Sequence, residues 1–156
     1  MTELQQLIEN LGLQAHPEGG FYKETYRSAQ TLEWEDRHLL TSIYFLLTAE
    51  NVSKFHRIKS DELWYFHAGS PLIVHTLSEN GHEQHLLGLD LNKGQQPFLW
   101  IPKDTIFGSS ILDNEGYSLV SCAVAPGFDF RDFELFDRSF LLEKFPAHRE
   151  IIEQLS

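Results

Sequence analysis

Basic residues are scarce in this chain. The 12 Lys and Arg stand against 23 Asp and Glu, which leaves a formal net charge of −11 over 156 residues. Such a balance disfavours a surface that binds nucleic-acid phosphates or anionic lipids. We therefore expect neither nucleic acid nor a membrane among its partners.

Cysteine is nearly absent, and long apolar runs are missing. Cys122 is the single cysteine, which excludes a disulfide within the chain and a zinc site built from cysteines. Its apolar neighbours predict a core position. No run reaches the roughly 18 to 20 apolar residues that span a bilayer, and the first residues lack the basic start and apolar stretch of a secretory signal. We expect a soluble, cytoplasmic protein.

The composition supplies enough apolar material for one core, since 42% of the residues are hydrophobic and 13% aromatic. We expect a single domain over residues 1–156. Leu4, Leu7, Ile8 and Leu11 have helical spacing behind Thr2, which predicts an amphipathic helix over residues 2–11. A closing helix is expected over about residues 146–155.

Between about residues 19 and 125, short apolar or alternating runs are separated by turn sequences. The clearest expected strands are residues 41–47, 62–67, 72–77, 83–89, 98–101, 105–112 and 117–124. Strands at this spacing, with no helix between them, indicate an antiparallel sandwich, jelly roll or barrel. The predicted fold class is all-β.

A degenerate metal-site motif lies in this region. His56, Glu62 and Gly69 have the spacing of the first cupin motif, in which a His-x-His pair precedes a Glu and a Gly. Ile58 stands where the second histidine would be. The second cupin motif is echoed by residues 102–107, in which Phe107 replaces the histidine.

Three longer phrases resemble a cupin subfamily of unknown function that is often described as sugar-epimerase-like. They are HPEGGFYKETYRS at 16–28, DELWYF at 61–66 and APGFDF at 125–130. The resemblance extends from Leu7 to about Pro146. It implies a double-stranded β-helix, the cupin jelly roll, with short N- and C-terminal helices. It also implies a homodimer and a barrel pocket for a small-molecule ligand.

The residues at the motif positions indicate whether the chain can bind a metal ion. Metal-binding cupins use three imidazoles and one carboxylate, and here only His56 and Glu62 keep ligand side chains. Two ligands rarely retain a first-row metal, so no cofactor is expected. His75 lies on a bordering strand, but the pattern leaves its direction open. His82 and His85 are expected on an exposed hairpin.

Alternation predicts the surroundings of the acidic residue. Glu62, Trp64 and Phe66 share one face of a strand, so all three point into the barrel if Glu62 does. Burial raises the pKa of a carboxyl unless a cation pairs with it. Such a carboxyl–imidazole pair can move protons near neutral pH, and it equally fits an internal ion pair that ties two strands together.

Epimerisation next to a carbonyl needs a base, an opposing acid and donors that stabilise the enolate. His56, oriented by Glu62, is the candidate base. Tyr44 is the candidate acid, although apolar residues fill both faces of its strand. Arg27 is a candidate for an anionic substrate group. The candidate substrate-binding residues are Trp64, Phe66, Phe107, Ser109 and Arg27.

Three functions stay open. The first is a metal-independent isomerase or epimerase that acts on a small carbohydrate-like carbonyl compound. The second is a non-catalytic module that binds a sugar or nucleotide, and the third is a metal-dependent cupin enzyme with an altered ligand set. A fold does not by itself determine a function. The geometry of the site is therefore needed to distinguish these three functions.

Overall fold

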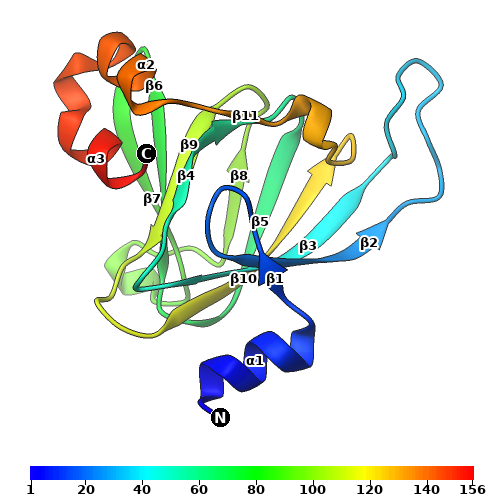
Figure 1. The fold of residues 1–156 in the computed structure, drawn as a ribbon, viewed down its shortest axis with the longest axis horizontal. Helices are drawn as coiled ribbons and strands as arrows, with labels where there is room; N and C mark the ends of the chain where they lie inside the picture. The colour runs from blue at the N-terminus through cyan, green and yellow to red at the C-terminus, as the bar shows by residue number, and fades with distance from the viewer.

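The computed structural model describes residues 1–156 and consists of two antiparallel β-sheets packed face to face (Figure 1). The six-stranded sheet has the order β1 (Gln14–Ala15), β2 (Phe21–Arg27), β3 (Thr41–Thr48), β10 (Tyr117–Ala125), β5 (Asp61–Gly69) and β8 (Phe98–Ile101). The five-stranded sheet has the order β11 (Glu134–Leu135), β4 (Ser53–Arg57), β9 (Ile106–Ile111), β6 (Leu72–Ser78) and β7 (Gly81–Leu87). The all-β prediction is confirmed, together with the seven expected strands.

Short helices flank the sheets at both ends of the chain, as expected. Helix α1 (Glu3–Leu11) is capped at its start by Thr2, whose side chain accepts a hydrogen bond from the Gln5 backbone, and at its end by Gly12. The expected closing helix is a 3-10 turn, η3 (Pro146–His148), followed by α3 (Arg149–Gln154). Helix α2 (Arg138–Lys144) was not expected. None of these helices is long and apolar enough to cross a membrane.

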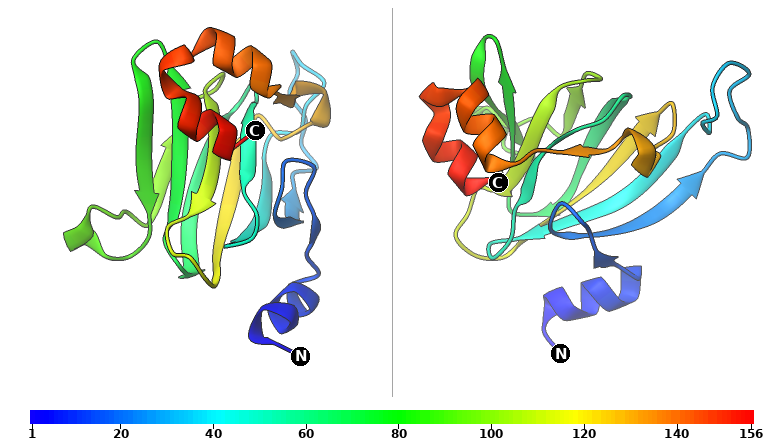
Figure 2. Two further views of the ribbon diagram at one scale, coloured as in Figure 1. Left: turned by 60° about the vertical axis from the view of Figure 1, so that its left-hand side comes forward. Right: turned by 45° about the horizontal axis from the view of Figure 1, so that its top comes forward.

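Strand β3 shows why both faces of a strand can be apolar. Phe45 and Leu47 point between the sheets and join the main core, whereas Tyr44 and Leu46 point outward and pack with the apolar side of α1. Helices α2 and α3 cover the outer face of the five-stranded sheet in the same way (Figure 2). The helices therefore bury outward-facing apolar residues that alternation alone leaves unexplained.

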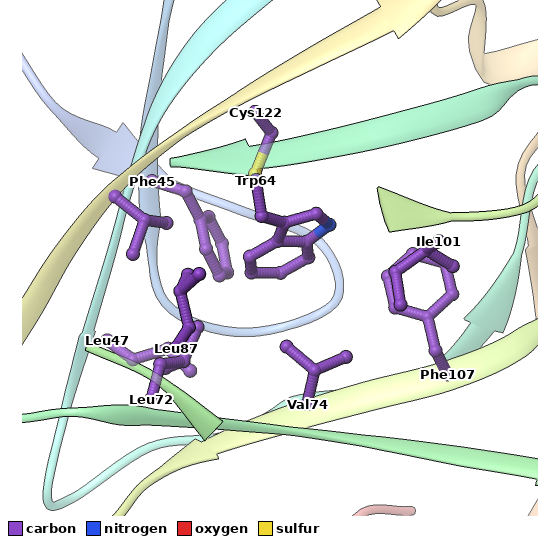
Figure 3. Packing of buried hydrophobic residues seen from close by; sticks show 10 residues of the cluster. Phe45, Leu47, Trp64, Leu72, Val74, Leu87, Ile101, Phe107 and Cys122 are labelled. Carbon is purple, nitrogen blue, oxygen red and sulfur yellow. The ribbon is translucent and has the colours of Figure 1, made fainter. Parts of the chain in front are cut away.

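The main core fills only one part of the space between the sheets. Figure 3 shows Phe45, Trp64, Phe107 and their aliphatic neighbours directed toward one another there. Further along β3, the inward residues Thr41 and Ile43 line a cavity instead. The same change occurs on β5 between Trp64 and Glu62, so packed core gives way to an internal hollow at one end of the barrel.

Candidate functional site

The internal cavity is lined by strands of both sheets and by two covering segments. The space open to the centres of water molecules is about 40 Å³, enough for a few waters or for the reacting end of a small molecule. Its walls are formed by His16, Glu18, Tyr22, Thr41, Ile43, His56, Ile58, Glu62, Cys122, Val124, Phe128 and Phe133. Two histidines and two glutamates in so small a space make it the candidate site.

A buried ion pair stands at the centre of this cluster. Nε2 of His56, on β4, lies 2.7 Å from Oε2 of Glu18, and both side chains are less than a tenth exposed. Glu18 comes from the turn between β1 and β2, where Gly19 has a φ of +112° and lies against the carbonyl of Val52. A Cβ at Gly19 would come within 1.9 Å of that oxygen, so glycine allows the turn to carry Glu18 inward.

His56 is held as an imidazolium. Its Nε2 makes the 2.7 Å ion-pair contact with Oε2 of Glu18, and its Nδ1 lies 2.6 Å from the carbonyl oxygen of Lys54, which can only accept a hydrogen bond from Nδ1–H. Burial would lower the pKa of His56, but the charge and hydrogen bond of Glu18 and the Lys54 carbonyl raise it above its ordinary value. Burial would likewise raise the pKa of Glu18, and His56 lowers it below its ordinary value.

The pKa of Glu62 is shifted in the opposite direction from that of Glu18. Burial, reinforced by the negative charge of Glu18, raises the pKa of Glu62 to about 7, although the charge of His56 and a hydrogen bond from Trp64 act against this. The Trp64 indole nitrogen donates to Oε2 of Glu62 at 2.9 Å. The cavity therefore holds one carboxyl that stays ionised beside one that exchanges its proton near neutral pH.

Two further cavity residues add polar groups. The backbone N–H of Glu18 donates to Nδ1 of His16 at 3.1 Å, which leaves hydrogen on the Nε2 of that ring. Burial lowers the pKa of His16, so it is neutral at pH 7, although the charge of Glu18 opposes this effect. The His16 ring lies edge-on to Tyr22 with centroids 4.7 Å apart. A neutral imidazole and a phenol thus share one side of the cavity.

An aromatic segment covers the opening. Phe128 and Phe133 flank η2 (Phe130–Asp132) and line the cavity, with the Phe133 ring centroid 5.4 Å from that of His56. Asp132 is fixed by a paired hydrogen bond from Arg37, at 2.7 Å to each oxygen. The segment that follows β10 therefore covers the cavity with phenylalanine side chains.

The structure brings together two of the predicted site residues at the cavity. His56 and Glu62 both line it, but the direct partner of His56 is Glu18 rather than Glu62. The expectation that Glu62 orients His56 is therefore corrected. Glu62, Trp64 and Phe66 do share the inward face of β5, and Trp64 and Phe66 belong to the packed core beside the cavity.

The remaining candidates lie away from the cavity wall. Phe107 is a core residue whose ring centroid is 4.2 Å from that of His56, so it supports the imidazole from behind. Ser109 is buried in β9 opposite Ser53. Tyr44 points to the outer face of β3, under α1. Arg27 lines an adjoining surface cleft and forms an ion pair with Glu24 at 2.6 Å.

Sequence reasoning missed that the turn before β2 and the start of β2 contribute side chains to the cavity. His16, Glu18 and Tyr22 lie within the first phrase that carries the resemblance, yet no strand periodicity directs them inward. The adjacent Gly19 and Gly20, both with positive φ, were the available signal of a close backbone approach.

A family model described as Cupin superfamily (DUF985) matches residues 5–136. The chain belongs to this cupin family. Its fold, two antiparallel sheets with short terminal helices, is accordingly the cupin fold.

Individual relatives of this cupin extend the similarity over the whole chain. Protein SO0799 from Shewanella oneidensis has 45% identity and a TM-score of 0.94, covering 100% of this chain and 98% of that one. A hypothetical protein from Leishmania major has 39% identity and a TM-score of 0.91, with coverage of 100% and 99%. The uncharacterized protein YML079W of Saccharomyces cerevisiae is 32% identical over 148 residues, covering 84% of this chain and 74% of the yeast protein. None of these names states an activity.

The cavity of this cupin does not fit the metal of metal-binding cupins. Ile58 and Phe107 stand at two ligand positions, and both ring nitrogens of His56 are engaged by protein oxygens. No three His, Cys, Asp and Glu side chains are grouped so that they could hold an ion. The residues present are instead suited to proton transfer by protein side chains.

Proposed function

We propose that this cupin is a metal-independent isomerase or epimerase that moves a proton at the carbon next to a carbonyl group in a small carbohydrate-like compound. One observation carries the proposal: Glu62, with a pKa raised to about 7, faces an enclosed cavity beside the buried Glu18–His56 ion pair. A base is most effective when its pKa lies near the working pH. The resemblance to sugar-epimerase-like cupins points the same way.

The ionised form of Glu62 is the base in this proposal. It takes the proton from the carbon, and the electron pair moves into the carbonyl to give an enolate. The His56 imidazolium stabilises the negative charge that develops, because a fixed charge acts strongly in a site with little water. Glu18 keeps His56 protonated without competing as a base, since its own pKa is lowered.

Return of the proton requires a second donor on the cavity wall. Tyr22 and the neutral His16 both line the cavity, whereas Tyr44 lies outside it. We assign the role of opposing acid to Tyr22, whose phenol replaces the one expected at Tyr44. The proton that reaches the enolate carbon from the other face inverts that centre and leaves Tyr22 as a phenolate. Solvent then returns a proton to Tyr22 and accepts the proton held by Glu62, which restores both groups.

The adjoining cleft gives the substrate a place for its non-reacting part. This cleft is about 620 Å³ and shares Tyr22, Thr41, Ile43 and Phe128 with the internal cavity. It also contains Arg27 and Gln14. We expect the carbonyl end of the substrate to enter the cavity while its remaining hydroxyl groups lie in the cleft.

Deuterium exchange tests this function directly. The purified protein is incubated in deuterated buffer with a panel of small aldoses and ketoses, and proton NMR follows the signal of the hydrogen next to the carbonyl. At least one compound should lose this signal faster than in buffer alone. The rate should rise with pH through about 7, because only ionised Glu62 accepts the proton.

Two results separate the alternatives. Saturable binding of a sugar or nucleotide with no exchange above the buffer rate contradicts the isomerase and supports a binding module. Exchange that disappears on dialysis against a chelator, and returns only with added metal, contradicts the metal-independent mechanism.

A further inference from the structure

The surface cleft that adjoins the internal cavity contains more negative than positive side chains. Its lining residues come mainly from β2 and β3, which run side by side (Figure 1), and from the segment that follows β10. Arg27 is the only Lys or Arg among them, whereas Glu24 and Asp129 both contribute carboxylates. The chain as a whole carries a formal net charge of −11. The cleft therefore offers an anionic ligand a single guanidinium.

That guanidinium is already engaged by the protein. Nε and Nη2 of Arg27 both donate to Oε1 of Glu24, at 3.1 and 2.6 Å, and Nη2 also donates to the carbonyl oxygen of Phe128 at 3.3 Å. Residues three apart on a regular strand point to opposite faces, but the register of β2 shifts between Glu24 and Tyr26. This irregularity brings Glu24 and Arg27 together in the cleft.

Repulsion, rather than the strength of this pair, opposes the binding of a phosphate. Both side chains are more than a third exposed, so the pair itself contributes little. A phosphate ester carries about −1.5 to −2 charges near pH 7, and a displaced Glu24 carboxylate would remain beside it. Hydrogen bonds from Arg131 hold the pKa of Asp129 well below its usual range, so Asp129 stays ionised as well. An anion would therefore lie next to two carboxylates.

An uncharged sugar meets favourable groups in the same cleft. Oε2 of Glu24 makes no hydrogen bond within the protein, so it is free to accept one from a hydroxyl group. The Gln14 amide can both donate and accept. Phe130 is 51% exposed, and its ring meets that of Phe128 edge-on with centroids 4.8 Å apart. These rings offer an apolar surface to the C–H groups of a sugar.

We propose that Glu24 makes this cleft selective for uncharged sugars over their phosphate esters. The inference rests on the proposed function, because it names the substrate class of the same site. It replaces the expectation that Arg27 binds an anionic substrate group. Arg27 instead holds Glu24 in place, and Glu24 is the specificity-determining residue. Without its carboxylate, the guanidinium becomes available to a phosphate.

Binding of matched sugars tests the selectivity without requiring any reaction. The full-length protein is titrated at low ionic strength with ribose, ribose 5-phosphate, fructose and fructose 6-phosphate, and ligand-observed NMR gives each Kd. The uncharged member of at least one pair should bind about 10-fold more tightly than its phosphate. Glu24→Gln should tighten phosphate binding by about 10-fold through the freed Arg27. Adding Arg27→Ala to Glu24→Gln should remove this gain.

Glu9→Gln is the matched control. Glu9 is exposed on α1 and does not line the cleft, so the same loss of charge there should leave the preference unchanged. Tighter binding of phosphates by the unchanged protein, equal effects of Glu24→Gln and Glu9→Gln, or no binding of either uncharged sugar overturns the selectivity.

The selectivity and the proposed function fail in different ways. Binding of uncharged sugars without proton exchange contradicts the isomerase and leaves the selectivity standing. Proton exchange on sugar phosphates but not on the uncharged sugars supports the isomerase and overturns the selectivity.

Discussion

Glu62→Gln is expected to slow substrate proton exchange by about 10²- to 10⁴-fold, because it removes the group assigned as general base. The change is otherwise small: an amide oxygen at this position can accept the 2.9 Å hydrogen bond from the Trp64 indole. The measurement is the exchange rate at saturating substrate and pH 7.5 in deuterated buffer. The rise in rate through about pH 7 should disappear in the variant as well.

Stability shows whether the variant has merely unfolded. The pKa of Glu62 is raised from 4.5 to about 7 in the folded protein, so its protonated form stabilises the fold below pH 4.5 and this contribution is lost as the pH rises through 7. The loss is about 3 kcal/mol. The Glu62→Gln variant has no carboxyl at this position, so it does not undergo this loss of stability. Its free energy of unfolding relative to that of the unchanged protein should therefore increase from pH 4.5 to pH 8.

Asp61→Asn is the matched control for this substitution. Asp61 is the exposed neighbour of Glu62 on β5, and its carboxylate accepts a hydrogen bond from the Lys103 backbone that an asparagine oxygen can also accept. The same carboxyl-to-amide change there should leave exchange unaltered. Equal exchange rates in Glu62→Gln and Asp61→Asn would remove Glu62 from the mechanism.

Glu18→Gln is expected to destabilise the protein by about 3–5 kcal/mol, because it removes one partner of a buried ion pair. The measurement is urea unfolding. Glu18, with a pKa below its ordinary 4.5, stabilises the fold above pH 4.5 and loses this effect as the pH falls. His56, with a pKa above 6.5, stabilises the fold below pH 6.5 and loses this effect as the pH rises. The difference between variant and unchanged protein should therefore be largest between pH 4.5 and 6.5.

An exposed ion pair that involves the neighbour of His56 provides a comparison for the buried pair. Arg57, the residue after His56, forms an ion pair with Glu134 at 2.6 Å, and both side chains are at least a third exposed. Glu134→Gln should cost at most about 1 kcal/mol. If Glu18→Gln costs no more than Glu134→Gln, the buried pair does not hold the turn in the barrel as described.

Much of the fold could be predicted because alternation and turn residues are local signals. Phe98–Ile101 matches β8 at both ends, and the inward face of β5 follows from the spacing of Glu62, Trp64 and Phe66. Strands β2 and β4 were harder to recognise, because charged residues such as Lys23, Glu24 and Lys54 interrupt their apolar pattern. Tertiary packing, rather than local pattern, defines these strands.

The site was less accessible to sequence reasoning than the fold. The motif located His56 and Glu62, but the partner of His56 is Glu18, far away in the chain and brought inward by a glycine turn. A contact of this kind depends on how loop and barrel pack, and it leaves no periodic signal. Tyr44 illustrates the converse error, since an apolar strand gives no direction until α1 is placed over its outer face.

The titration of Glu62 tests the central claim most directly. Protein labelled with carbon-13 at the glutamate carboxyls is followed by NMR from pH 4 to pH 9, and the Glu62 signal is identified by its absence from Glu62→Gln. A midpoint near pH 7 is predicted, as expected for a buried carboxyl beside an ionised Glu18. A midpoint near the ordinary value of 4.5 would contradict the claim that the barrel holds a proton-exchanging group matched to neutral pH.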